Sequence, residues 1–113
     1  MKSMEEMIQA AQKAAETIQK QMNEAQGKLE QIEVEGVSGG GLVKIRCTAK
    51  GRVVGVSLDD SLVQVSEKGI LEDLVAAAFN DARTKADQVS GEEMSRMQQG
   101  LGLPPGFNFP GLG

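Results

Sequence analysis

Apolar and small residues recur through the first third of the chain at alternating spacings of four and three. The series runs Met4, Ile8, Ala11, Ala15, Ile18, Met22, Ala25, Leu29 and Ile32. This spacing aligns the side chains along one stripe of a helix, in the a/d heptad pattern of helices that pack on another helix. Ser3 and Glu6 form a capping box at its start. The pattern therefore predicts a helix over residues 4–31.

The pattern changes after Ile32, because residues 33–58 alternate and are rich in Val and Gly. Glycines 39–41 indicate a turn, and Lys50-Gly51 indicates a two-residue hairpin turn. The strand pairs that follow from this turn are Cys47 with Val54, Ile45 with Val56 and Val43 with Leu58. This register gathers most large apolar residues on one face. With a first strand over about 33–37, the sequence predicts a three-stranded antiparallel meander with one buried face.

A second amphipathic pattern begins near Ser66, a residue suited to cap a helix. Its apolar stripe consists of Ile70, Leu71, Leu74, Val75, Ala78, Phe79, Ala82, Ala86 and Val89. Residues 90–93 form another capping box, so we expect the helix to break or bend there before a short segment with Met94 and Met97. We expect a single α+β domain over residues 1–99 and a flexible Gly/Pro-rich tail over 100–113.

Composition excludes several classes of protein. The chain has no His and one Cys, which removes the commonest general base, disulfides within the chain and multi-cysteine zinc sites. No apolar run is long enough to span a membrane, and the polar N-terminus is unlike a secretory signal. We therefore expect a cytoplasmic protein with no cofactor, metal, membrane partner or small-molecule substrate, and not an enzyme.

The motifs that carry chemistry elsewhere have simpler explanations here. Adjacent carboxylates at 72–73 and 92–93 diverge on a helix and cannot form a catalytic pair. Glycines 39–41 precede a strand rather than a helix, which does not fit a phosphate-binding loop. Cys47 lies on the apolar face of the predicted hairpin and has no His to activate it. These features leave no candidate catalytic residue.

The length of the first helix points to a homodimer. About 28 residues span ~42 Å, whereas a compact chain of this size is only about 35 Å across. Part of the stripe would then protrude and need a partner, and closed two-fold dimers are the usual oligomer. The candidate interface residues are Ile8, Ile18, Met22 and Leu29. The Val-rich strand over 52–58 is a second possible interface, because few charges guard its edge.

Several motifs together resemble the YbaB/EbfC family of bacterial nucleoid-associated proteins. They are Val34-Glu35-Gly36, Gly39-Gly40-Gly41-Leu42-Val43-Lys44, Leu71-Glu72-Asp73-Leu74-Val75, Ala77-Ala78 and Asn80-Asp81-Ala82. The resemblance covers roughly residues 4–97. It implies an α-β-β-β-α homodimer, associated with the nucleoid, that binds duplex DNA, changes its conformation and affects gene expression.

The net charge of −4 argues against a strongly basic DNA-binding surface, so phosphates would be bound by local Lys and Arg residues. The candidates are Lys13, Lys20 and Lys28 on the first helix, Lys44 and Arg46 on the sheet, with Arg52 beside the turn, and Arg83, Lys85 and Arg96 on or beyond the second helix. Ordinary solubility is the competing explanation for each. No helix-turn-helix or zinc finger appears, so we expect low sequence specificity. The alternative function is a dimeric interaction module or adaptor that does not bind DNA directly.

Overall fold

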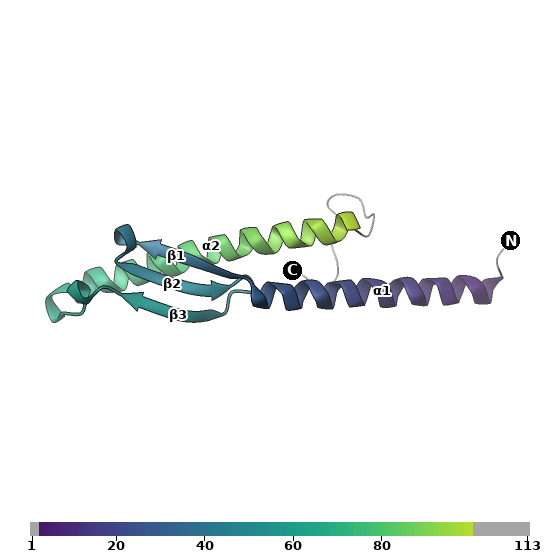
Figure 1. Cartoon of the computed structure of the whole chain (residues 1–113), viewed down its shortest axis with the longest axis horizontal. Coiled ribbons are helices and arrows are strands. Elements are labelled where there is room, and N and C mark those ends of the chain that lie inside the picture. The colour runs from purple at the N-terminus through teal and green to yellow at the C-terminus, as the bar shows by residue number, and fades with distance from the viewer. Residues whose placement is uncertain (1–2, 101–113) are drawn as a thin grey trace.

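Two long helices precede and follow a three-stranded sheet along the chain (Figure 1). The computed structural model describes residues 3–100. Its elements are α1 (Met4–Gln31), β1 (Glu33–Ser38), β2 (Val43–Thr48), β3 (Val53–Leu58) and α2 (Lys68–Gly100). The predicted α+β order of elements is therefore confirmed. The expected tail over 100–113 lies outside the described residues except for Gly100, which is the last residue of α2 instead.

The first helix has the predicted bounds and extends well past the rest of the fold. The Ser3 hydroxyl accepts a hydrogen bond from the Glu6 backbone N–H at 3.2 Å, as expected of an N-cap. Every side chain from Met4 to Thr17 is exposed, and we call this half of the helix the α1 arm. The arm makes the molecule 77 Å long and only 22 by 18 Å in cross-section (Figure 1). The predicted protrusion of the helix is confirmed.

The sheet has the predicted antiparallel order β1-β2-β3, with one local correction. Val43 pairs with Leu58 and Ile45 with Val56 as expected, but Cys47 pairs with Val53 instead of Val54. The turn has three residues rather than two, because the Thr48 backbone N–H donates to the Arg52 carbonyl at 2.8 Å. Gly51 adopts the left-handed backbone that such a turn requires, with a φ of 95°. A β-bulge in β3 then restores the predicted register.

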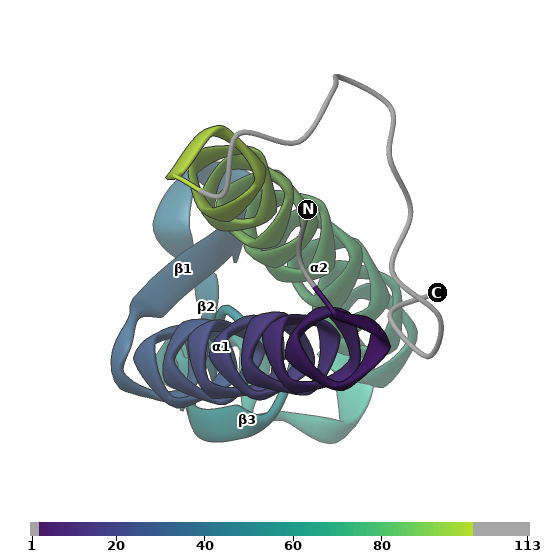
Figure 2. The same ribbon diagram turned by 90° about the vertical axis from the view of Figure 1, so that its right-hand side faces the viewer.

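The second helix is longer than predicted and runs through Ser90 without interruption. The Glu93 side chain, which a capping box would turn back toward Ser90, instead pairs with Lys28 of α1 at 3.0 Å and Arg96 at 2.7 Å. Met97 is buried one turn further on. Contact with α1 therefore favours a continuous helix over the expected break. The two helices lie side by side and antiparallel, and both extend from the sheet toward the same end of the molecule (Figures 1 and 2).

The core lies where α2 crosses one face of β1 and β2. Alanines 78, 82 and 86 of α2 are buried against Val43, Ile45 and Cys47 of β2. Small side chains let the helix backbone approach closely, and at Gly36 of β1 there is no room for a side chain at all. Because α2 packs on β1 and β2 and barely on β3, this face of β3 stays open. Val56 is 55% exposed although Ile45, its partner across the strands, is buried.

Candidate nucleic-acid interface

The β2–β3 hairpin is a positively charged segment of an acidic chain. Residues 43–58 contain four basic side chains and no acidic one, whereas the whole chain carries a net charge of −4. The four residues are Lys44, Arg46, Lys50 and Arg52, and all four are exposed. We call this segment the basic hairpin. Lys50 was missed as a candidate from the sequence, although the absence of Asp and Glu from the hairpin is visible there.

Two of these side chains lie on the face of the sheet opposite α2. Val43, Ile45 and Cys47 are buried beneath α2, so the alternation of β2 directs Lys44 and Arg46 to the opposite face. Arg46 extends across β3 above Gly55, where an added Cβ would lie 2.5 Å from Arg46 Nη2. Gly55 therefore leaves the space that the Arg46 guanidinium occupies above β3.

The acidic partners of the basic hairpin are few and exposed. Arg46 pairs with Glu33 of β1 at 3.4 Å, and Lys50 pairs with Glu30 of α1 at 3.4 Å. Within the described residues, Lys44 and Arg52 form no ion pair. Exposed pairs at this distance contribute little to stability. Anionic oxygens from a ligand can therefore replace the two carboxylates at low cost.

The first helix carries two further candidates, Lys13 on the α1 arm and Lys20 just beyond it. They lie seven residues apart on one face, opposite the stripe that includes Ile18 and Leu29. Neither forms an ion pair within residues 3–100. Glu16 and Glu24 lie four residues before and after Lys20, so this face of α1 carries both positive and negative charges.

Lys28 and Arg96 are brought together, but by a buried carboxylate. Glu93 binds both, and its side chain is only 9% exposed. One negative charge is thus shared between two positive ones at the point where α1 meets α2. These residues join the helices, which accounts for their positions without a ligand.

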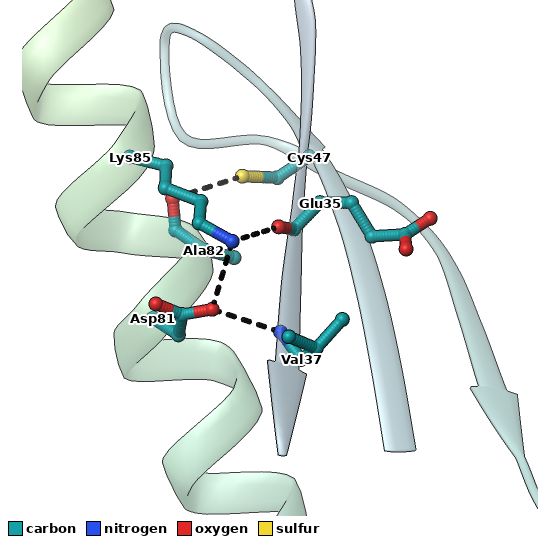
Figure 3. Close-up of polar contacts among 6 residues, drawn as sticks. All are labelled: Glu35, Val37, Cys47, Asp81, Ala82 and Lys85. Carbon is teal, nitrogen blue, oxygen red and sulfur yellow. Dashed lines mark hydrogen bonds and ion pairs between the residues drawn. The ribbon is translucent and has the colours of Figure 1, made fainter. Parts of the chain in front are cut away.

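Lys85 is engaged in holding α2 on the edge strand β1 (Figure 3). Its Nζ donates to the Glu35 carbonyl at 2.8 Å and pairs with Asp81 at 3.0 Å. Asp81 in turn accepts from the Val37 backbone N–H at 2.9 Å, and this hydrogen bond is the main reason that the pKa of Asp81 lies below its ordinary value. Lys85 and Asp81 therefore occupy β1 groups that an additional strand would need.

Arg83 does not join Lys85 in one patch. Residues two apart on a helix point in different directions, and Arg83 lies beside Gly51 at the hairpin turn. It pairs with Asp87 one turn along α2 at 3.4 Å. Arg83 therefore extends the basic hairpin at its turn, whereas Lys85 serves the opposite side of α2.

The four dimer candidates on α1 differ in how far the rest of the chain buries them. Leu29 is buried, and Ile18 and Met22 are half-buried where α1 packs on α2 of the same chain. Only Ile8, on the arm, remains exposed. The heptad pattern over the second half of α1 thus finds its partner within the chain.

Residues 3–100 offer little for other kinds of chemistry. No cluster of three or more Cys, Asp or Glu in this range could hold a metal ion. None of the helices in this range is both long and apolar enough to cross a membrane. Burial raises the pKa of the Cys47 thiol, whose Sγ–H points to the Ala82 carbonyl at 3.8 Å (Figure 3).

Comparison with known proteins identifies similar sequences and a similar fold. Residues 1–101 match the profile of the YbaB/EbfC DNA-binding family. A nucleoid-associated protein of Rhodopseudomonas palustris is 52% identical over 97 residues, which cover 86% of this chain and 92% of the relative. A nucleoid-associated protein of Rickettsia bellii is 49% identical over 98 residues, covering 87% and 92%.

A solved structure supports the fold. An uncharacterized protein of Helicobacter pylori superimposes with a TM-score of 0.66 over 74% of this chain and 87% of its own, at 22% sequence identity. At this identity the likeness concerns the arrangement of helices and strands.

Proposed function

Because this chain belongs to the YbaB/EbfC DNA-binding family, we propose that it binds duplex DNA through its basic hairpin, with low sequence preference, and thereby affects DNA conformation and gene expression. Membership of the family also confirms the expectation of a DNA-binding protein that is not an enzyme. The observation that carries the choice of surface is the absence of acidic residues from positions 43–58.

Phosphate contacts are the interactions that this surface suits. Lys44 and Arg52 are exposed and have no ion pair within the described residues. The Arg46 guanidinium lies on the sheet face opposite α2. Duplex DNA presents closely spaced phosphates, and each one neutralised by Lys or Arg releases a condensed counterion. Arg46 and Lys50 can exchange their exposed carboxylate partners for phosphate oxygens. This exchange allows binding by a chain whose overall charge is negative.

Low sequence preference follows from the form of the surface. A flat sheet face with basic side chains binds the DNA backbone, and such contacts orient a protein without reading the bases. The hairpin sequence contains no aromatic residue on which unpaired bases could stack. We therefore expect similar affinity for unrelated duplexes and weaker binding to single strands.

Paired substitutions test the choice of surface. Lys44→Ala with Arg46→Ala should weaken duplex binding by about tenfold, since two phosphate contacts are lost in each chain. Lys13→Ala with Lys20→Ala, the arm variant, removes the same charge from α1 and should weaken binding much less. Gel retardation of two unrelated duplexes measures both. All four side chains are exposed, so circular dichroism should show unchanged helix content.

Two outcomes would contradict the proposal. If only the arm variant loses affinity, the DNA lies along α1 and the surface is wrongly assigned. If the wild-type protein fails to retard duplex DNA at ~50 mM salt, where electrostatic binding is strong, direct DNA binding is wrong. The alternative of a dimeric interaction module would then account for the fold.

The homodimer forms through the part of β3 that faces the same side as α2 but is not covered by it. Val56 and Leu58 point to the same side as the buried Ile45 and Val43, yet α2 does not cover them. Phe79, two residues before Asp81, lies on the side of α2 away from β1 and is 43% exposed. We call Val54, Val56, Leu58 and Phe79 the β3 face. An apolar strip of this kind beside an unpaired sheet edge is typical of a protein–protein contact.

The two edges of the sheet support this choice of interface. Asp81 and Lys85 occupy backbone groups of β1, whereas β3 has no such contact within the described residues. A second copy with the same uncovered strip offers a self-complementary surface, as two-fold dimers require. The dimer would present two basic hairpins to one DNA molecule.

Sedimentation velocity tests the interface. Val56→Asp places a charge in the β3 face and should convert the dimer to a folded monomer at micromolar concentration. Ile8→Asp places the same charge on the α1 arm and should leave the dimer intact; Ile18 is unsuitable because it packs partly on α2. A dimer that survives Val56→Asp and dissociates with Ile8→Asp would place the interface on α1.

A further inference from the structure

The α1 arm exposes a stripe of apolar side chains. Met4 is 78% exposed, Met7 61% and Ile8 52%. With Ala11 and Ala15 they continue the stripe whose later members, from Ile18 to Leu29, pack on α2. We call Met4, Met7, Ile8, Ala11 and Ala15 the arm stripe. Its sequence pattern is that of a helix in contact with a partner, but it has none within the described residues.

The cover that α2 provides stops at a defined point. Side chains of α1 change from exposed to half-buried at Ile18, and α2 ends at Gly100 shortly after the buried Met97. Fourteen residues of helix separate Ile18 from Met4, which corresponds to ~21 Å. The uncovered stripe therefore begins about where α2 ends and runs away from it along α1.

The sequence continues beyond that point with a segment of suitable length and chemistry. Residues 101–113 contain no charged side chain and five large apolar ones, Leu101, Leu103, Phe107, Phe109 and Leu112. An extended chain of thirteen residues reaches up to ~43 Å, about twice the length of the arm stripe. Two of the three Phe residues of the whole protein lie in this segment.

We propose that residues 101–113 bind along the arm stripe of their own chain, with Phe107 and Phe109 as the main contacts. Attachment at Gly100 keeps the segment at a high effective concentration next to the stripe, so weak apolar contacts suffice. Burying the aromatic rings against Met and Ile side chains removes apolar surface from water on both sides. The segment covers the first half of α1, as α2 covers the second half.

This contact is separate from the DNA-binding proposal. The family match ends at residue 101, so the segment lies almost wholly beyond it. The arm stripe is on the opposite face of α1 from Lys13 and Lys20, and its residues belong neither to the basic hairpin nor to the β3 face. Tests of this contact therefore need no DNA.

Disulfide cross-linking of the full chain tests the contact and its occupant. Ala11→Cys lies on the arm stripe and Asn108→Cys lies between the two Phe residues, so the main apolar side chains are kept. The matched control pairs Asn108→Cys with Gln9→Cys, on the opposite face of the same helix. Cys47 is buried, and its raised pKa leaves it a poor competitor.

The stripe pair should oxidise about tenfold faster than the control pair, and the product should run as a single chain on a denaturing gel at every protein concentration. Equal rates for the two pairs would overturn the proposal. A product of two linked chains, formed at a rate that falls on dilution, would show that another copy occupies the stripe and would overturn it as well.

Hydrogen exchange provides a second measurement that does not depend on engineered thiols. Phe107→Ser with Phe109→Ser should lower amide protection over residues 5–17 by about tenfold, while Asn108→Ser should leave it unchanged. The melting temperature should change little, because the arm lies outside the core of α2 and the sheet. Unchanged protection in the double variant would contradict the contact.

Discussion

Gly36 is where α2 and the sheet approach most closely, and Gly36→Ala should separate them. An added Cβ would lie 2.6 Å from Ala82 Cβ and nearer still to the Ala78 carbonyl oxygen and the Ala82 nitrogen. Ordinary contacts begin near ~3.5 Å, so α2 must move outward by about 1 Å. Two of these atoms belong to the helix backbone and the third is a Cβ, so none can rotate away as a longer side chain can.

The cost has two parts. Overpacking a core by one methyl group costs about 1–3 kcal/mol. Outward movement also strains the hydrogen bonds from Val37 to Asp81 and from Lys85 to the Glu35 carbonyl, each contributing about 0.5–1.5 kcal/mol. The free energy of unfolding should therefore fall by about 2–6 kcal/mol, a large share of the ~5–15 kcal/mol of an ordinary domain.

Urea unfolding followed by circular dichroism measures this loss, at one protein concentration because the stability of the proposed dimer would depend on concentration. Gly91→Ala is the matched control: it adds the same methyl group to α2, where no atom lies within 4 Å. It should stabilise the protein by about 0.5–1 kcal/mol, since alanine favours helix. A Gly36→Ala variant within ~0.5 kcal/mol of the wild type would refute the close packing of α2 on β1.

Three further predictions concern single side chains. The lowered pKa of Asp81 adds stability that is complete above the ordinary carboxyl pKa of ~3.9 and is lost as pH falls through the folded value; Asp81→Asn should remove this part of the acid dependence in urea titrations between pH 2 and ~6. The Cys47 thiol should react with a disulfide reagent at pH 8 only when urea unfolds the protein, because burial raises its pKa and blocks access. Glu93→Gln should cost about 1–2 kcal/mol in unfolding experiments, and its effect should shrink in a Lys28→Gln background if the two side chains are coupled.

The predicted hairpin register shows that burial determined the strand pairing, whereas turn chemistry did not determine the length of the turn. The sequence pattern placed Ile45 opposite Val56 correctly because both had to share one face. The turn itself was wrong by one residue, and the bulge in β3 compensates for that residue. Glycine at position 51 is compatible with both turns, so the pattern alone could not distinguish them.

The length of α2 depended on a contact between distant parts of the chain. A capping box at 90–93 predicted a break, but Glu93 binds Lys28, which is 65 positions earlier in the sequence. Local rules carry no information about such a partner. For the same reason the heptad pattern of α1 could not show that its second half packs on α2, leaving only the arm uncovered.

The sequence identifies the Lys and Arg residues that are candidates for DNA contact, but it does not show which of them are held by other groups of the protein. Lys28, Lys85 and Arg96 bear the expected charge, yet each is held by a carboxylate or carbonyl of another element or the next turn. Which cations stay free depends on tertiary packing. The sequence does show that the hairpin has no acidic residue, and the structure adds that Lys44 and Arg46 lie on the sheet face opposite α2.

The salt dependence of duplex binding tests the central claim most directly. If about four to six phosphates are neutralised per dimer, the slope of log affinity against log salt should be roughly −4 to −5 for the wild type. Lys44→Ala with Arg46→Ala should flatten this slope by about three to four units, because the dimer loses two phosphate contacts in each chain and each contributes ~0.9. A slope that is unchanged in this variant would show that the basic hairpin does not contact DNA.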